Sequence, residues 1–135
     1  DIKVLVRGIQ NDLFDLGADL STPISKAKQS YKPLRITENQ IKKVEEKIDE
    51  YNDELKPLNS FILPGGSEAA SLIHLSRTIA RRAERDVSLL SSEEEINKNS
   101  LVYLNRLSDL LFVLSRVLNE NGLNDVLWVP GLNQK

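Results

Sequence analysis

The sequence of 135 residues predicts an all-α protein, an up-and-down helical bundle. Apolar residues recur at intervals of three and four in every long patterned stretch, which is the period of one face of an α-helix. Sustained alternation of apolar and polar residues, the pattern of a half-buried strand, is not found. Connections of modest length favour helices that run up and down beside one another. A chain of this size is expected to form one domain, residues 1–135, around one core.

The first helix is expected between residues 2 and 20. Its apolar positions are Ile2, Leu5, Ile9, Leu13, Leu16 and Leu20. The pattern ends at Ser21-Thr22-Pro23. Residues 24–36 are expected to form a polar surface loop, because proline interrupts a stretch rich in basic residues. The residues concerned are Lys26, Lys28, Lys32, Pro33 and Arg35.

A second helix is expected to begin after Thr37, because Thr37 and Gln40 have the spacing of a capping box. It should end near Pro57, and its apolar positions repeat at the spacing of a bundle seam: Ile41, Val44, Ile48, Tyr51 and Leu55. The following segment, F-I-L-P-G-G-S from Phe61, is apolar and then contains a Gly65-Gly66 pair. We expect a tight turn that orients Phe61 and leaves Ser67 to cap the next helix.

The third helix should run to about Leu90, and the fourth from about Asn99 to Asn119, where Asn121-Gly122 ends it. The connector between them, residues 91–98, contains an acidic run that is expected to be solvated. The fourth helix is rich in leucine and valine around its whole circumference, so it is expected to be buried on nearly all sides.

The third helix carries the sequence R-T-I-A-R-R-A-E-R from Arg77. At about 100° per residue, Arg77, Arg81 and Arg85 form one stripe, and His74 and Glu84 fall in the same arc. The core face is expected on the other side, at Leu72, Leu75, Ile79, Ala83, Val87 and Leu90. Because like charges at this spacing cost about 0.2 to 0.5 kcal/mol per pair, the stripe predicts an external anion, and guanidinium groups suit a polyphosphate. The alternative is a salt-bridged subunit interface.

A second polar line is expected on the fourth helix, at Asn105, Asp109, Phe112 and Arg116. A polar line on a buried helix must face a partner or a site, because an unsatisfied buried polar group costs about 1 to 3 kcal/mol. The two lines together predict opposite walls of one polar pocket. The alternative for the second line is a ladder of hydrogen bonds between helices, or a subunit contact.

Several classes of protein are excluded by composition. The chain has no cysteine, which removes disulfides and cysteine-ligated metals. It has 18 basic and 20 acidic residues, so no global field favours nucleic acid or an acidic membrane. No apolar run approaches the roughly 18 residues that span a bilayer, and a signal peptide is not found, so a cytoplasmic protein is expected. Because the chain begins at Asp1 and has no methionine, we expect its natural start to lie upstream.

Other kinds of site fail on their residues. His74 is the only histidine, so a di-iron centre with two Glu-x-x-His motifs is excluded, and His74 is expected to be a structural residue. Glu68, Ser71 and His74 lie on a helix without the strained turn of a nucleophilic triad. Gly65-Gly66 lacks the lysine and serine of a phosphate-binding Walker loop.

The segments F-I-L-P-G-G-S from Phe61, R-T-I-A-R-R-A-E-R from Arg77, E-I-N from Glu95 and Y-L-N-R-L-S-D-L-L-F from Tyr103 closely resemble the propanediol-utilisation type of ATP:corrinoid adenosyltransferase. The resemblance covers nearly the whole chain, including L-F-D-L-G-A-D-L-S-T-P from Leu13. It implies a five-helix bundle assembled as a homotrimer, with active sites between subunits. It also implies a reaction, in which Co(I) of a reduced corrinoid attacks the 5′ carbon of ATP and releases triphosphate, with magnesium on the phosphates.

The resemblance further implies roles for individual residues. The positions expected to bind ATP are Arg81, Arg82, Ala83, Glu84, Arg85 and Asn105. Arg77 matches an arginine that pairs with an acid of the first helix. Phe61 matches an aromatic residue that lies against the lower face of the corrin and keeps its base off cobalt, and Phe112 is a further candidate for corrinoid contact. Phe61 is otherwise expected to anchor its loop in the core. No residue is assigned to a metal.

The family's phosphate-binding segment and first helix are expected upstream of Asp1. A corrinoid reductase or an adenosylcobalamin-dependent mutase is an expected partner. The alternative from another class is a non-catalytic helical module that forms oligomers and binds a polyphosphate or an acidic partner through the arginine stripe.

Overall fold

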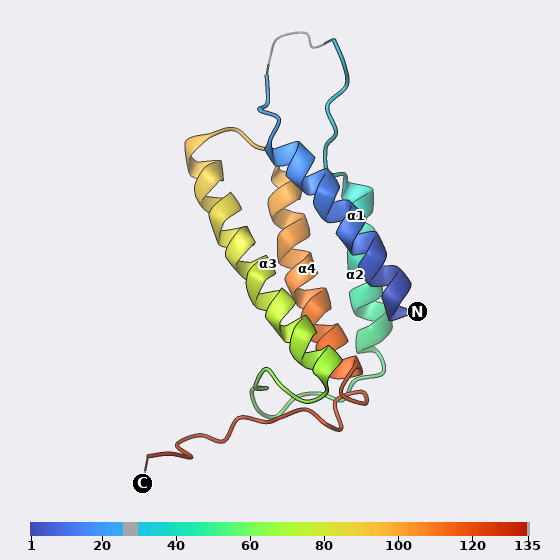
Figure 1. Cartoon of the computed structure of the whole chain (residues 1–135), viewed down its shortest axis with the longest axis vertical. Helices are drawn as coiled ribbons and strands as arrows, with labels where there is room; N and C mark the ends of the chain where they lie inside the picture. The colour runs from blue at the N-terminus through green and yellow to red at the C-terminus, as the bar shows by residue number, and fades with distance from the viewer. Residues whose placement is uncertain (26–29, 135) are drawn as a thin grey trace.

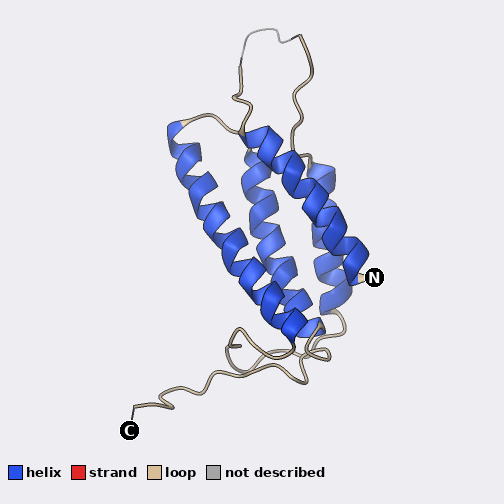
Figure 2. Cartoon of the chain, viewed as in Figure 1, coloured by secondary structure: helices blue, strands red, loops and turns tan. Residues whose placement is uncertain are grey.

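The computed structural model describes residues 1–25 and 30–134. The described residues form four helices: α1 (Ile2–Leu20), α2 (Glu38–Asn52), α3 (Glu68–Glu93) and α4 (Lys98–Val117) (Figure 1, Figure 2). The part of the chain described contains no strand beyond an isolated antiparallel bridge between Ile62 and Leu127. The predicted all-α class is confirmed.

The ends of the helices follow local chemistry. The Thr37 hydroxyl accepts from the Gln40 amide at 3.3 Å, and the Thr37 amide donates to Gln40 Oε1 at 3.0 Å, so the predicted capping box is confirmed. The second helix nevertheless ends at Asn52, before the predicted Pro57, and the third continues to Glu93, beyond the predicted Leu90. Of the predicted loop between α1 and α2, Lys26 and Lys28 lie outside the described residues.

The fourth helix is the centre of the fold. It packs mainly against α3 on one side and α2 on the other, and more lightly against α1 (Figure 1). Its largest fully buried side chains are Tyr103, Leu110 and Leu114. Burial on nearly all sides of this helix was expected from its composition, and the structure confirms it.

The predicted core face of α3 is only partly right, since Val87 is buried and Ala83 packs against the core. Leu72, Leu75 and Ile79 are 50–57% exposed, whereas the buried residues of α3 are Ala70, His74, Ala80 and Val87. The side that faces α4 therefore lies beside the arginine stripe, whose Arg81 and Arg85 remain exposed. Small alanine side chains allow the two helices to approach, and long polar side chains can lie along an interface while their charged ends reach water. The apolar pattern showed that α3 has an apolar face, but it did not show which face packs against α4.

A network around Asp19 ties the top of the bundle together. Its Oδ2 accepts from the Ile36 amide at 2.7 Å, Asn97 Nδ2 at 2.7 Å and Ser100 Oγ at 3.0 Å, and its Oδ1 accepts from Arg35 at 2.8 Å. Burial alone raises the pKa of Asp19, but these hydrogen bonds outweigh it and hold the pKa below its usual value. The end of α1, the loop before α2 and the start of α4 thus share one carboxylate.

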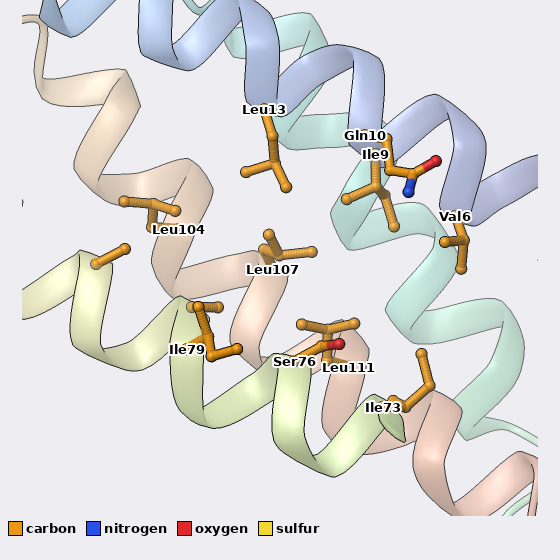
Figure 3. A pocket seen from close by; sticks show the side chains of 12 residues that line it. Val6, Ile9, Gln10, Leu13, Ile73, Ser76, Ile79, Leu104, Leu107 and Leu111 are labelled. Carbon is orange, nitrogen blue, oxygen red and sulfur yellow. The ribbon is translucent and has the colours of Figure 1, made fainter. Parts of the chain in front are cut away.

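An apolar cavity of about 330 Å³ lies between α1 and α3, with α4 as its floor (Figure 3). Its lining includes Ile9 and Leu13 of α1, Ile73 and Ile79 of α3, and Leu107 of α4. In Figure 3 these side chains point toward one another across the space between the helices. The cavity suits an apolar occupant and offers almost nothing to a phosphate.

Among the described residues, none of the helices is long and apolar enough to cross a membrane.

Candidate functional site

The arginine stripe follows the edge of α3 where the α3–α4 interface meets solvent. Arg81, Arg82 and Arg85 are exposed, and their guanidinium groups form no hydrogen bond or ion pair with another described residue. Arg77 is half-buried, and its guanidinium carbon lies 5.3 Å from the centre of the Phe112 ring on α4. This is the geometry of a cation–π contact. Arg77 of the stripe is therefore held by the protein, whereas Arg81, Arg85 and the neighbouring Arg82 are available to a ligand.

Glu84 and Asn105 meet across the same interface. Asn105 Nδ2 donates to Glu84 Oε1 at 2.9 Å, and Asn105 Oδ1 accepts from Arg106 Nη2 at 2.5 Å. Arg106 also forms an ion pair with Asp109 at 2.9 Å. These contacts fix the amide orientation of Asn105, because a donor and an acceptor are each satisfied. The half-buried Glu84 supplies negative charge beside the exposed arginines.

The two polar lines contact each other directly. The prediction that they form opposite walls of one pocket is wrong for this chain, because Glu84 meets Asn105 and Arg77 meets Phe112 with no space between. They form instead one polar seam along a single face of the bundle. The prediction of hydrogen bonding between the helices is confirmed for Asn105. Arg81 and Arg85 lie on the side of the seam that is open to solvent.

Arg116 does not belong to the seam. It is buried at the lower end of α4, where its Nε donates to Asp125 Oδ2 at 2.9 Å and its Nη2 donates to the Lys56 carbonyl at 2.9 Å. Both members of the Arg116–Asp125 pair are nearly inaccessible to water. Helical spacing placed Arg116 in line with Asn105, but the chain beyond α4 folds back and pairs with it.

Phe61 lies on the loop that precedes α3, and its side chain is 77% exposed. The expectation that it anchors the loop in the core is therefore excluded for this chain. Its ring meets the Trp128 ring edge to face, with centroids 5.8 Å apart and planes at 63°. An aromatic side chain of this exposure, held at a defined angle, is available for contact with a flat apolar ligand.

The Gly65-Gly66 turn orients this loop as predicted. Gly66 has φ +102°, a conformation that L side chains rarely adopt, and a Cβ atom there would lie 2.2 Å from Asn119 Oδ1. The Asn119 amide group bridges the turn, accepting from the Ser67 amide at 2.9 Å and donating to the Gly65 carbonyl at 3.0 Å. Ser67 then caps α3. The turn is therefore fixed by the backbone conformation of Gly66 and by the two hydrogen bonds of Asn119.

His74 is buried, and its Nε2 has no hydrogen-bond partner among the described residues. Burial lowers the pKa of His74, the Arg77 charge lowers it further, and Asp125 opposes both. The imidazole is therefore neutral at physiological pH. The described residues contain no group of three or more histidine, cysteine, aspartate or glutamate side chains that could hold a metal.

The predicted site residues lie at two levels of α3. Arg77, Arg81, Glu84 and Asn105 share the seam, whereas Phe61 precedes α3, whose first residue, Glu68, lies about 20 Å from Arg81 along the helix axis at 1.5 Å per residue. Ala83 lies away from the seam, in the wall of the apolar cavity. Asn119, Asp125 and Trp128, which shape the lower level, were not predicted. The one available signal was the single tryptophan in the tail that follows the fourth helix.

Residues 1–118 match the sequence profile of a family described as cobalamin adenosyltransferase. The corrinoid adenosyltransferase of Mycobacterium leprae is 51% identical over 134 residues, which cover 96% of this chain and 69% of that protein. The corrinoid adenosyltransferase of Bacillus subtilis is 46% identical over 127 residues, covering 93% of this chain and 63% of that protein.

Solved structures agree with the sequence relatives. A variant of the PduO-type ATP:corrinoid adenosyltransferase from Lactobacillus reuteri, complexed with cobalamin and ATP, superposes with a TM-score of 0.80 at 41% identity, covering 90% of this chain and 67% of that one. A second variant of the same enzyme, complexed with ATP, gives a TM-score of 0.80 at 40% identity over 91% of this chain and 68% of that one. On fold and sequence, the chain belongs to the cobalamin adenosyltransferase family.

Proposed function

We propose that this protein transfers the 5′-deoxyadenosyl group of ATP to the Co(I) centre of a reduced corrinoid. The observation that carries the proposal is the polar seam, in which the exposed guanidinium groups of Arg81 and Arg85 flank a fixed glutamate–asparagine pair. Family membership over residues 1–118 supports it, as do related structures that hold cobalamin and ATP.

The chemistry needs stabilised charge and no general base. The cobalt electron pair of the substrate forms a bond to C5′ of ATP, the C5′–O bond breaks, and its electron pair leaves with triphosphate. Arg81, Arg82 and Arg85 are proposed to bind the triphosphate, because guanidinium forks donate bidentately to phosphate oxygens. Preorganised positive charge at a developing anion is commonly the largest contribution to catalysis. Asn105 and Glu84 would fix the position of the nucleotide at the inner edge of the seam.

Phe61 and Phe112 are proposed to act on the corrinoid. The exposed Phe61 ring would lie against the lower face of the corrin and exclude the lower base from cobalt. Phe112 contributes indirectly, since its ring lies under Arg77 and limits where that guanidinium can point. Arg77 is proposed to pair with an acid outside residues 1–135, as the resemblance implies.

Magnesium is proposed to bind through the phosphates. The described residues provide no cluster of three acidic or histidine ligands. This fits an ion that keeps several waters and is held largely by substrate phosphate oxygens, as magnesium commonly is in nucleotide sites. Bound there, the ion would neutralise part of the triphosphate charge alongside the arginines.

The remaining assignments concern the whole protein. We propose that residues 1–135 are one domain and that the phosphate-binding segment and first helix of the family lie outside them. The longer length of the relatives supports this, since the chain covers 69% and 63% of two of them. A cytoplasmic homotrimer, supplied with electrons by a corrinoid reductase and delivering product to an adenosylcobalamin-dependent mutase, would complete the proposal.

The deciding experiment gives the complete natural protein ATP and chemically reduced cobalamin. Formation of a cobalt–carbon bond is followed by the absorption spectrum, and triphosphate release is measured in parallel. We expect equal amounts of adenosylcobalamin and triphosphate. Binding of ATP without either product would instead identify a non-catalytic polyphosphate-binding module.

A further inference from the structure

The segment that follows α4 returns to the loop that carries Phe61. The Leu63 amide donates to the Val126 carbonyl at 2.7 Å, and the Trp128 amide donates to the Phe61 carbonyl at 2.9 Å. Ser60 Oγ donates to the Trp128 carbonyl at 3.0 Å. Residues 60–63 and 126–128 therefore form a short antiparallel pair, which holds the backbone of Phe61 although neither segment is a full strand.

Asp125, directly before residues 126–128, anchors the same segment to α4. Asp125 accepts from the buried Arg116 at 2.9 Å, and Arg116 also donates to the Lys56 carbonyl, where the loop before Phe61 begins. Asn119, one turn further along, holds Gly65 and Ser67 on the other side of that loop. Arg116, near the end of α4, and Asn119, just beyond it, thus hold the Phe61 loop at both of its ends. Arg116 also holds the start of the returning segment through Asp125.

One side chain of the returning segment meets the Phe61 ring itself. Trp128 contacts it edge to face at 5.8 Å, and an interaction of this kind favours one ring orientation beyond what burial alone provides. Because Phe61 is 77% exposed, the core does not fix its ring. We propose that Trp128 is a positioning residue that orients Phe61 against the lower face of the corrinoid. This inference rests on the proposed function, since it takes the corrin as the ligand of Phe61.

The proposal is tested in the complete protein by the fraction of bound Co(II) corrinoid that is four-coordinate, a spectroscopic signature of base exclusion. Trp128→Ala should lower the ratio of four- to five-coordinate cobalt by about 2- to 10-fold, the range expected for one aromatic pair. Trp128→Phe should retain most of the ratio. Leu127→Ala is the matched control, because Leu127 is a neighbour of similar exposure, 46% against 44%, on the same segment.

A double-mutant cycle with Phe61→Ala separates positioning from direct contact. If Trp128 acts through Phe61, Trp128→Ala should change nothing further in the Phe61→Ala background. An undiminished effect there, or an equal effect of Leu127→Ala, would overturn the proposal. ATP affinity should stay unchanged in all these variants.

A readout without cobalt chemistry distinguishes this inference from the proposed function. The Trp128 ring current should shift the aromatic proton resonances of Phe61, and Trp128→Ala should abolish that shift. A wild-type protein that makes no adenosylcobalamin contradicts the proposed function. Phe61 resonances that are identical in wild type and Trp128→Ala contradict the inference.

Discussion

The charged and aromatic side chains discussed above fall into two groups, which differ in their exposure to solvent and in their contacts. Arg81, Arg85 and Phe61 reach solvent with their functional groups, whereas Asp19 and Arg116 are buried and fully engaged by hydrogen bonds. Buried charged groups need such partners, because an unpaired buried charge is strongly unfavourable. The buried group holds the loops in place, and the exposed group is accessible from solvent.

Replacing Arg81 with alanine should impair turnover and leave the fold intact. Loss of one preorganised charge at the leaving group is expected to cost on the order of 2 to 4 kcal/mol of transition-state stabilisation, measured as kcat/KM. Arg81→Lys should recover only part of it, because an ammonium lacks the bidentate fork. Lys43→Ala, which removes an exposed charge from α2, is the control. Normal kcat/KM in Arg81→Ala would remove the arginine from the site.

Replacing Phe61 with alanine should affect cobalt chemistry far more than stability. A buried phenylalanine costs about 3 to 5 kcal/mol when truncated, but the exposed Phe61 should cost no more than about 1.5 kcal/mol, the upper value of its ring contact. Denaturant unfolding measures the first effect. The rate with Co(II) and a reductant should fall, while supply of prereduced Co(I) should restore much of it. A large loss of stability with unchanged cobalt coordination would contradict this role.

Helical spacing pointed to the arginines, and the family resemblance pointed to Phe61, but neither predicted how these side chains are oriented. Helical period grouped Arg77 with Arg81 and Arg85, yet only Arg77 is held, because Phe112 lies opposite it on another helix. The ring contact of Phe61 depends on a return of the chain more than sixty residues later, through Trp128. Such contacts between distant segments leave no periodic trace in the sequence.

At the scale of elements, the ends of the helices carry the organisation that the site needs. The capping box at Thr37 and the cap at Ser67 were predictable because they are local patterns of three or four residues. The face of α3 that packs against α4 was not predictable, since the leucine-rich face and the arginine-bearing face were both candidates for that contact. Packing against α4 selected the face with small alanines and left the leucines exposed.

The junction at Asp19 predicts a pH-dependent stability. Because the folded-state pKa lies below its usual value of 3.8, the ionised carboxylate stabilises the fold above that pH, and this stability is lost as pH falls through the folded-state pKa. Asp19→Asn should destabilise the protein by about 3 kcal/mol near pH 7, since an amide cannot accept from every present donor. Denaturant unfolding at several pH values should show the difference from wild type narrowing below about pH 4.

The control for this experiment is Asp49→Asn, which changes an exposed carboxylate on α2. Its stability should stay within about 0.5 kcal/mol of wild type at neutral pH. A gap between wild type and Asp19→Asn that stays constant down to acid pH would show that Asp19 acts through its shape and not through its charge.

At the scale of the whole molecule, apolar surface remains uncovered. Phe14 is 84% exposed and Val4 70%, the three α3 side chains named above add to this, and the cavity between α1 and α3 is open. Contiguous exposed apolar surface commonly marks an interface with other protein. A four-helix bundle of this chain therefore has sides that are suited to contact with further polypeptide.

We predict that the complete protein is a homotrimer. Sedimentation equilibrium at micromolar concentration should give three times the mass of one chain, because burial of the exposed apolar side chains drives association. Dilution should shift the midpoint of thermal unfolding, as mass action requires for a folded oligomer. A stable monomer over the whole concentration range would contradict the prediction.

The position of Trp128 gives the protein a built-in reporter. It is the only tryptophan of residues 1–135, so all indole fluorescence of this part of the protein arises beside the Phe61 ring. Corrinoids absorb in the region where indole emits, and a corrin seated on Phe61 would quench that emission by resonance energy transfer. Binding of the corrinoid could thus be followed in unlabelled protein, in real time and separately from ATP, by the brightness of one side chain.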